Sequence, residues 1–314
     1  MAEMFTVSSS PHIRDNNSVQ SIMRDVIIAL LPATAAGIYF FGMPAVLVIL
    51  TAVIACVASE WAWCKITKGA NTTKDLSAVV TGILLAFNVP PSLPLWMVVV
   101  GSVFTMIVVK ALFGGIGQNI VNPALAGRAF LLASYPVAMT TWTTPGVDAA
   151  SSATPLAILK GVEAGGAQLP SLGQAFIGQV GGCIGETSAL ALLIGFAYLL
   201  YRRIITWHIP VVYIGTVLVL GMISGRSALG GIFEIMAGGL MLGAIFMATD
   251  YTTSPMNKKG QIVFALGCGI LTMVIRQFGG YPEGVSYSIL IMNLFVPLID
   301  KFVKQRVFGT GEVK

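Results

Sequence analysis

Residues 148–155 read Asp-Ala-Ala-Ser-Ser-Ala-Thr-Pro, with three hydroxyl side chains among small residues. The segment lies in the one long polar interruption, residues 135–177, of an otherwise apolar sequence. A hydroxyl in an exposed loop can accept a covalently attached group, which makes Thr154 a candidate attachment site. Thr154 followed by Pro155 and an apolar run also predicts a helix N-cap with proline at the first helical position. The two interpretations are compatible, because a helix start offers free backbone N–H groups to an attached phosphate.

The composition predicts a membrane protein. Hydrophobic residues make up 56% of the 314-residue chain, charged residues 10%, and the mean hydropathy is +0.85. So few charges cannot cover the surface of a water-soluble domain. The 35 glycines agree with this class, because small residues let transmembrane helices approach closely. The net charge of +5 is scattered between apolar runs without a basic stripe, which argues against binding to nucleic acid.

Apolar runs of about 20 residues, or fewer where helices are broken, predict an all-α protein with ten transmembrane helices. Residues 1–21 are polar and lack the apolar core of a secretory signal peptide, so the N-terminus is expected in the cytoplasm. The runs lie at residues 22–42, 44–64, 77–89, 94–113, 119–134, 178–200, 208–224, 229–249, 261–278 and 285–303.

The distribution of Lys and Arg tests this number of spans. With ten spans, fourteen of the 18 cations fall on the cytoplasmic side, as the positive-inside rule requires. Leaving out either short run, 77–89 or 119–134, would invert the loops that follow. The ten-span arrangement predicts that both termini are cytoplasmic and that Thr154 is on the outer face. The fourteen cations are Arg14, Arg24, Lys65, Lys68, Lys74, Lys110, Arg202, Arg203, Lys258, Lys259, Lys301, Lys304, Arg306 and Lys314.

A weak internal sequence repeat predicts two inverted five-helix repeats in the structure. Thr105-Met106 is followed by a lysine and Phe-Gly-Gly, and Thr272-Met273 by an arginine and Phe-Gly-Gly, with spacings that differ by two residues. Five spans separate the copies, which gives them opposite orientations; chance similarity between glycine-rich helices is the alternative. The predicted organisation is a cytoplasmic segment (1–21), a first repeat (22–134), an outer-face loop (135–177), a second repeat (178–303) and a cytoplasmic tail (304–314).

Polar, Gly- and Pro-rich stretches predict helix breaks within or beside the membrane. They lie at residues 88–91, 113–123 and 248–255. Irregular backbone at membrane depth is either buried in protein or lines a cavity. These breaks therefore predict either a bound ligand or tight turns between helices.

Ionisable residues inside spans are costly and are functional candidates by default. Glu186 and Glu234 fall in the outer parts of two predicted spans, and Glu60 near the inner end of another. Such carboxylates could bind Na+ or pass a proton, or could form structural ion pairs with Arg226 or Arg276.

Other chemistry is sparsely represented in the sequence. The four cysteines are scattered without a Cys-x-x-Cys pair, so no iron–sulfur or other metal site is predicted. The two histidines are isolated and lie near predicted membrane boundaries. Glycine patches such as residues 114–117 lack the flanking strand that a dinucleotide-binding motif needs.

Four segments together resemble one membrane family. They are residues 8–14 (Ser-Ser-Ser-Pro-His-Ile-Arg), 117–124 (Gly-Gln-Asn-Ile-Val-Asn-Pro-Ala), 148–154 and 248–255 (Ala-Thr-Asp-Tyr-Thr-Thr-Ser-Pro). The family comprises the D-type subunits of the Rnf complex and the B-type subunits of the Na+-translocating NADH:quinone reductase. The resemblance covers nearly the whole chain, and the short N-terminal segment is closer to the Rnf branch.

The resemblance implies a flavoprotein that works inside a larger machine. Segment 148–154 is similar to the sequence that flavin transferases read when they join FMN through its phosphate to a threonine, here Thr154. Asp148, Ser151 and Ser152 would be read by the transferase or would contact the phosphate. FMN would relay electrons, and Thr154 would not be a catalytic nucleophile. The resemblance also admits a second, non-covalent flavin such as riboflavin at the helix breaks.

The implied complex passes electrons between reduced ferredoxin and NAD+ and moves Na+ or H+ across the prokaryotic inner membrane. Its implied partners are the other membrane and peripheral subunits, the flavin transferase during maturation, and lipid. Two other functions remain open from the residues alone: a solute transporter or channel with inverted repeats and no redox role, and a scaffolding subunit. A scaffold would tolerate Thr154→Ala without loss of electron flow.

Overall fold

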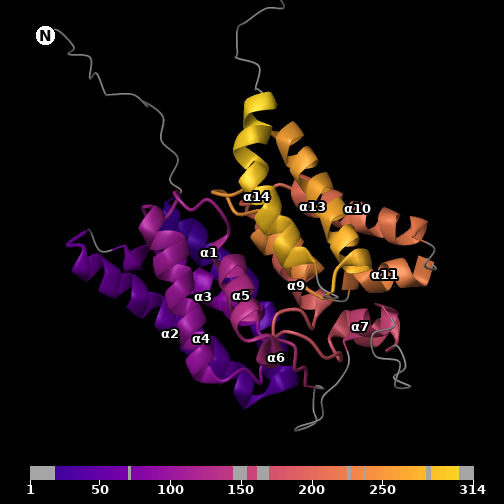
Figure 1. The fold of residues 1–314 in the computed structure, drawn as a ribbon, viewed down its shortest axis with the longest axis horizontal. Helices are drawn as coiled ribbons and strands as arrows, with labels where there is room; N and C mark the ends of the chain where they lie inside the picture. The colour runs from indigo at the N-terminus through magenta and orange to yellow at the C-terminus, as the bar shows by residue number, and fades with distance from the viewer. Residues whose placement is uncertain are drawn as a thin grey trace, which may run out of the picture.

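The computed structural model confirms the predicted all-α class, since every regular element in the described residues is a helix. In Figure 1 the helices form two groups side by side, the N-terminal group in indigo and magenta and the C-terminal group in orange and yellow. The described residues are 18–69, 72–143, 154–160, 170–224, 228–236, 238–280 and 284–303.

The N-terminal group begins at a capped helix and is divided where the sequence cannot continue a helix. Ser18 and Ser21 form a capping box at its start. Gly42 separates the first two helices at a φ of +64°, which glycine adopts without steric cost. The elements are α1 (Val19–Phe41), α2 (Met43–Ile66), η1 (Thr73–Asp75), α3 (Ser77–Phe87), α4 (Leu95–Val103), the π-helical η2 (Phe104–Lys110), η3 (Ala111–Phe113) and α5 (Pro123–Ser134).

The C-terminal group contains a helix that is broken at a glycine. Gly238 has a φ of +71°, and the helical pieces Gly230–Met236 and Leu240–Met247 on either side of it meet at a bend of 60°. The elements are α9 (Ala189–Tyr201), α10 (His208–Ile223), α11 (Ala228–Met236), α12 (Leu240–Leu242), the π-helical η4 (Gly243–Met247), α13 (Lys258–Phe278) and α14 (Val285–Phe302).

Three short helices occupy the described parts of the region between the two groups: α6 (Pro136–Met139), α7 (Pro155–Lys160) and α8 (Leu172–Ile177). In Figure 1, α7 lies toward the lower edge, below α11, whereas α14 ends at the upper edge. Short helices thus occupy the described part of the connection between the two groups.

Each of the ten predicted apolar runs contains helix, but fewer helices qualify as membrane spans by length and composition. Five described helices do so, and the bent α11–η4 pair would make a sixth. The five are α1, α2, Leu95–Phe113, α13 and α14. The apolar helices α3, α9 and α10 are shorter. The protein is therefore a polytopic membrane protein, and the number ten stays a prediction.

The predicted span 178–200 differs from the structure at its start. Turns follow Gly178, and helix begins only at Ala189, after the cap that Ser188 provides. The glycine-rich sequence here is a poor helix former. Its backbone instead bonds to the end of α3, where the Ile184 and Gly185 N–H groups donate to carbonyls of that helix end and the residues just after it.

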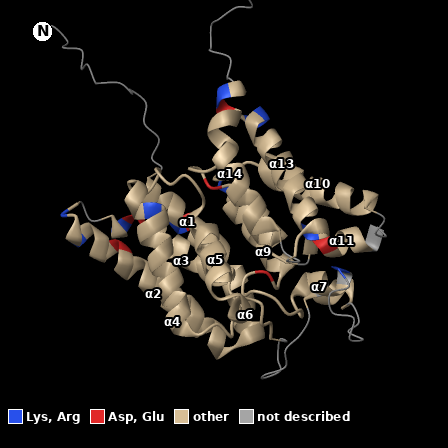
Figure 2. Cartoon of the chain, viewed as in Figure 1, with Lys and Arg blue, Asp and Glu red and all other residues tan. Residues whose placement is uncertain are grey.

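The outer surface of the helices is apolar, as contact with lipid requires. Ile54 is 65% exposed and Val219 53% exposed. Charged residues gather mainly near the ends of helices and beside α11 in Figure 2. Inside, glycine brings helices together: a Cβ on Gly82 of α3 would lie 2.8 Å from the Val53 Cα of α2. The helices pack by close backbone approach, as in other membrane proteins.

Candidate functional site

Thr154 is the residue immediately before α7. Its Oγ1 accepts a hydrogen bond from the Ala157 N–H at 3.2 Å, and its carbonyl accepts one from the Ile158 N–H. The predicted N-cap is therefore confirmed. The Thr154 side chain is buried, and Leu156 of α7 lies against the break between α11 and α12, where a Cβ on Gly238 would collide with it. The other predicted residues of this site, Asp148, Ser151 and Ser152, lie outside the described residues.

A cavity of about 340 Å³ lies between the two groups of helices. Its walls are largely apolar and include Val80, Leu84 and Phe246. We call it the central cavity. The polar residues in its lining come mainly from the predicted helix breaks and their neighbours: Ser77, Thr81, Lys110, Asn119, Asn122, Thr249, Asp250 and Thr252.

Hydrogen bonds between the two groups of helices join the break before α5 to the end of η4 and to α14. The Asn122 side chain caps α5 by accepting from the Ala124 and Leu125 N–H groups. The same side chain donates to the Met247 carbonyl at 3.2 Å. Asn293 of α14 accepts from the Asn122 N–H. The sequence predicts the two breaks separately, and the structure brings them together.

Both π-helical segments contribute to the central cavity. η2 ends at Lys110, and η4 contains Phe246, and both residues line the cavity. A π-helical turn inserts an extra residue and redirects the side chains that follow, and such turns are frequent at functional sites. The sequence patterns give no sign of either π segment.

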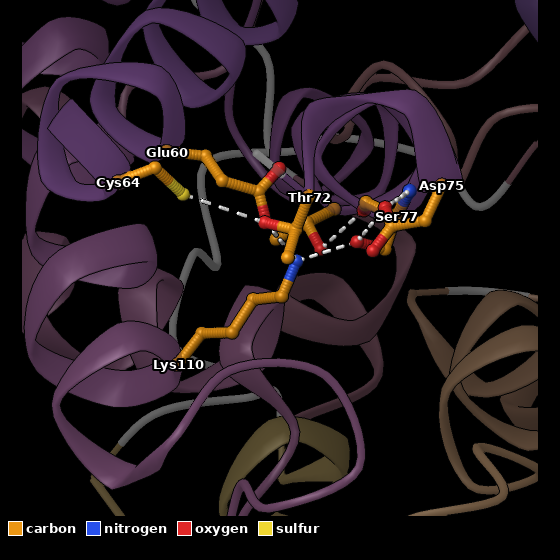
Figure 3. Close-up of polar contacts among 7 residues, drawn as sticks. Glu60, Cys64, Thr72, Asp75, Ser77 and Lys110 are labelled. Carbon is orange, nitrogen blue, oxygen red and sulfur yellow. Dashed lines mark hydrogen bonds and ion pairs between the residues drawn. The ribbon is translucent and has the colours of Figure 1, made fainter. Parts of the chain in front are cut away.

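Lys110 belongs to a buried polar network at the end of η2 and does not lie in an exposed loop, while its position on the cytoplasmic side of the membrane stays a prediction. Its ammonium donates to Glu60 Oε1 at 3.0 Å and to Ser77 Oγ at 2.6 Å, and the Ser77 hydroxyl donates to Asp75 Oδ1 at 2.5 Å. Figure 3 shows Lys110 reaching between Glu60 and Ser77. Burial forces such a charge to find a partner, and the apolar flanking sequence of Lys110 is the signal that it lies in a helix.

Glu186 and Glu234 are both buried near the break between α11 and α12. Glu186 pairs with Arg128 of α5, with 3.5 Å between Oε1 and Nη1. Arg128 also donates to Ser286 of α14 at 2.8 Å and so joins both groups of helices. Arg276 donates to the backbone carbonyl of Glu234 at 2.7 Å. Sequence reasoning offers Arg226 and Arg276 as partners but misses Arg128; Arg226 lies outside the described residues.

Cys56 and Cys64 lie on α2, Cys183 in the turns before α9 and Cys268 on α13, and no disulfide joins any two of them. Within the described ranges, no group of three or more His, Cys, Asp or Glu residues is placed to hold a metal ion.

The fold and the site define a polytopic, all-helical membrane protein with a partly polar cavity where broken helices meet. The chain belongs to the NQR2, RnfD, RnfE family, whose model matches residues 6–309. The predicted family is thereby confirmed.

Relatives of this chain are the D-type subunits of ion-translocating oxidoreductase complexes. It is 54% identical over 98% of its length to that of the Na+-translocating ferredoxin:NAD+ oxidoreductase complex of Acetobacterium woodii, covering 96% of that protein. It is 49% identical over 98% of its length to that of the proton-translocating ferredoxin:NAD+ oxidoreductase complex of Clostridium ljungdahlii, covering 97% of it. It is 39% identical over 96% of its length to that of the ion-translocating oxidoreductase complex of Alcanivorax borkumensis, covering 96% of it.

Proposed function

We propose that this chain is a D-type membrane subunit of a complex that passes electrons between reduced ferredoxin and NAD+ and couples their flow to movement of Na+ or H+. The similarity to the Acetobacterium protein, at 54% identity over 98% of the chain, carries this proposal. The two ferredoxin:NAD+ relatives are named for different ions, so the proposal includes both. The chain would work with the other subunits of such a complex in the prokaryotic inner membrane.

The first cofactor in this proposal is FMN joined through its phosphate to Thr154 Oγ1. Sequence similarity in segment 148–154 supports it, and FMN bound there would supply an electron relay. The hydroxyl that caps α7 is the atom that would become esterified. An ester oxygen is a weaker acceptor than a hydroxyl, so phosphate oxygens would take over the bond from the Ala157 N–H. Asp148, Ser151 and Ser152 keep their proposed role in transferase recognition or phosphate contact.

The second cofactor is a non-covalent flavin such as riboflavin in the central cavity. Ligand pockets commonly enclose about 300–1,000 Å³ and combine apolar walls with a few polar groups, and this cavity of about 340 Å³ does so. Val80, Leu84 and Phe246 would contact the faces of the flavin ring system. Asn119 and Thr81 would hydrogen-bond its polar edge, and Lys110 would supply a positive charge.

The proposed architecture is ten spans in two inverted repeats. Equivalent contacts support it: α2 packs on α3 and α4, as α10 packs on α11 and α13, and α1 pairs with α9 as α5 pairs with α14. Lys110 and Arg276 occupy matching places in the two copies of the internal sequence repeat, and both are buried. Each binds a partner in its own half, Lys110 the Glu60 side chain and Arg276 the Glu234 carbonyl. With α7 and the end of α14 at opposite edges in Figure 1, Thr154 would face outward and the termini the cytoplasm.

A denaturing extraction of the purified chain, expressed with the flavin transferase, tests both cofactors. We expect wild type to release one flavin and to keep another attached. Thr154→Val should lose only the attached flavin. Val80→Phe, which fills the central cavity, should lose only the released flavin. Val99→Phe is the matched control, because Val99 is 40% exposed on the outer surface of α4, and it should keep both.

Loss of neither flavin in these variants would contradict the assigned sites. A wild-type chain without any flavin, beside a transferase shown to modify a control substrate, would contradict the redox role. A lipid recovered from the cavity in place of flavin would favour the alternative of an inverted-repeat transporter.

A further inference from the structure

Lys110 is the only Lys or Arg among the described residues that line the central cavity. Its side chain is 5% exposed, and that of its partner Glu60 is 8% exposed. Asp250 is the only Asp or Glu among the described residues that line the cavity. The electrostatic character of the cavity therefore depends on one buried cation and on the carboxylates near it, those of Glu60, Asp75 and Asp250.

The position of the Lys110 ammonium is fixed by its contacts. Glu60 of α2 and Ser77 of α3 hold it from two different helices, at 3.0 and 2.6 Å. Ser77 is itself oriented by Asp75. Figure 3 shows these side chains converging on the end of Lys110. A lysine side chain is normally flexible, and this arrangement holds its charge at one point on the cavity wall.

We propose that Lys110 is a tuning residue that raises the reduction potential of the ring bound in the central cavity. This inference rests on the proposed second flavin. Two electrons and one proton added to an oxidised flavin ring leave it with one negative charge. A fixed cation at the wall stabilises that charged form relative to the neutral oxidised form, and it acts strongly because the interior has a low dielectric constant.

Glu60 has the opposite influence in this arrangement. Its carboxylate offsets the charge of Lys110, so removing the carboxylate makes the electrostatic potential in the cavity more positive. Removing the cation leaves the carboxylate without its partner and makes that potential more negative. The two substitutions Lys110→Met and Glu60→Gln should therefore shift the potential in opposite directions. A purely structural role for the pair would disturb the cavity in the same way in both variants.

The experiment is a redox titration of the purified full-length chain with dithionite, in a Thr154→Val background that leaves only the non-covalent flavin. We expect Lys110→Met to lower the midpoint potential by at least about 30 mV, a tenfold change in the two-electron equilibrium constant. Glu60→Gln should raise it. Lys110→Arg should restore it toward that of the parent. Lys65→Met is the matched control, since Lys65 is exposed beside Trp61, and should leave it unchanged.

Unchanged potentials, or shifts of the same sign in Lys110→Met and Glu60→Gln, would overturn the proposal. If Lys110→Met does not fold, Glu60→Gln decides alone, because a potential that is unchanged or lowered contradicts the inference. A parent protein that releases no flavin on denaturation would instead contradict the second-flavin proposal. The two failures are thereby distinguished by flavin content, which is measured before the titration.

Discussion

The side-chain amide of Asn122 donates to the backbone carbonyl of Met247 at 3.2 Å, across 125 residues of sequence. This bond joins the start of α5 to the end of η4, and hence the helix breaks of the two halves. Asn122 also caps α5, so one side chain both starts a helix and fixes it against the other half. The central cavity lies where these breaks meet.

The buried pair of Arg128 and Glu186 should be important for stability. Removing one partner of a buried ion pair leaves an uncompensated charge and costs about 3–5 kcal/mol. We therefore expect Arg128→Met to lower the melting temperature of the detergent-solubilised chain strongly. Arg202→Met is the comparison and should cost less: its partner Asp25 is also buried, with a side chain 8% exposed, but Arg202 is 45% exposed and Tyr198 still donates to Asp25 in the variant. Equal losses in the two variants would show that burial of the pair does not matter.

Close packing of α5 on η2 depends on Gly127. A Cβ at this position would collide with Thr105 Oγ1, which is buried and bonded to the Gly101 carbonyl. Gly127→Ala should destabilise the chain by about 1–3 kcal/mol through overpacking. Gly215→Ala of α10 meets no atom within 4 Å and should be neutral or stabilising by up to about 1 kcal/mol. Thermal unfolding of both variants measures this, and a stable Gly127→Ala would rule out the close contact.

Stability should depend on pH through Asp250, which lies outside the spanning helices. Burial raises the pKa of its carboxyl, although hydrogen bonds from Thr253, Thr252 and Asn119 and the charge of Lys110 oppose this. A raised pKa means that the ionised form is less favourable in the folded than in the unfolded chain, so the cost is present above the raised pKa. It disappears as the pH falls below the ordinary pKa of aspartate, where both states are protonated.

Asp250→Asn removes that ionisation. The variant should melt at a higher temperature than wild type at pH 8, and the difference should narrow as the pH is lowered through the raised pKa. Melting curves of both proteins across this range give the answer. A difference that grows toward acid pH would mean that the carboxylate is stabilised, not penalised, by its surroundings.

The helices are predictable because long apolar runs, and the Gly, Pro and Asn residues that end or cap helices, are local features of the sequence. The cap at Thr154 and the break near Asn122 belong to this class. Pairings between distant charges are not predictable in the same way. Sequence reasoning places Glu186 beside Arg226 or Arg276, yet it binds Arg128, because the turns before α9 fold back on the end of α3. The positive-inside rule counts Lys110 among the cytoplasmic cations but does not reveal that it is buried against Glu60.

Intact mass and in-gel flavin fluorescence after denaturation test the proposal that Thr154 carries a covalent flavin. Wild type, Thr154→Val and Thr154→Ser would be expressed with the flavin transferase. We predict a fluorescent band and the added mass of FMN on wild type, both absent from Thr154→Val, with the serine variant showing whether a hydroxyl alone suffices. A band of equal intensity on Thr154→Val, or none on wild type while the transferase modifies a control substrate, would contradict the account.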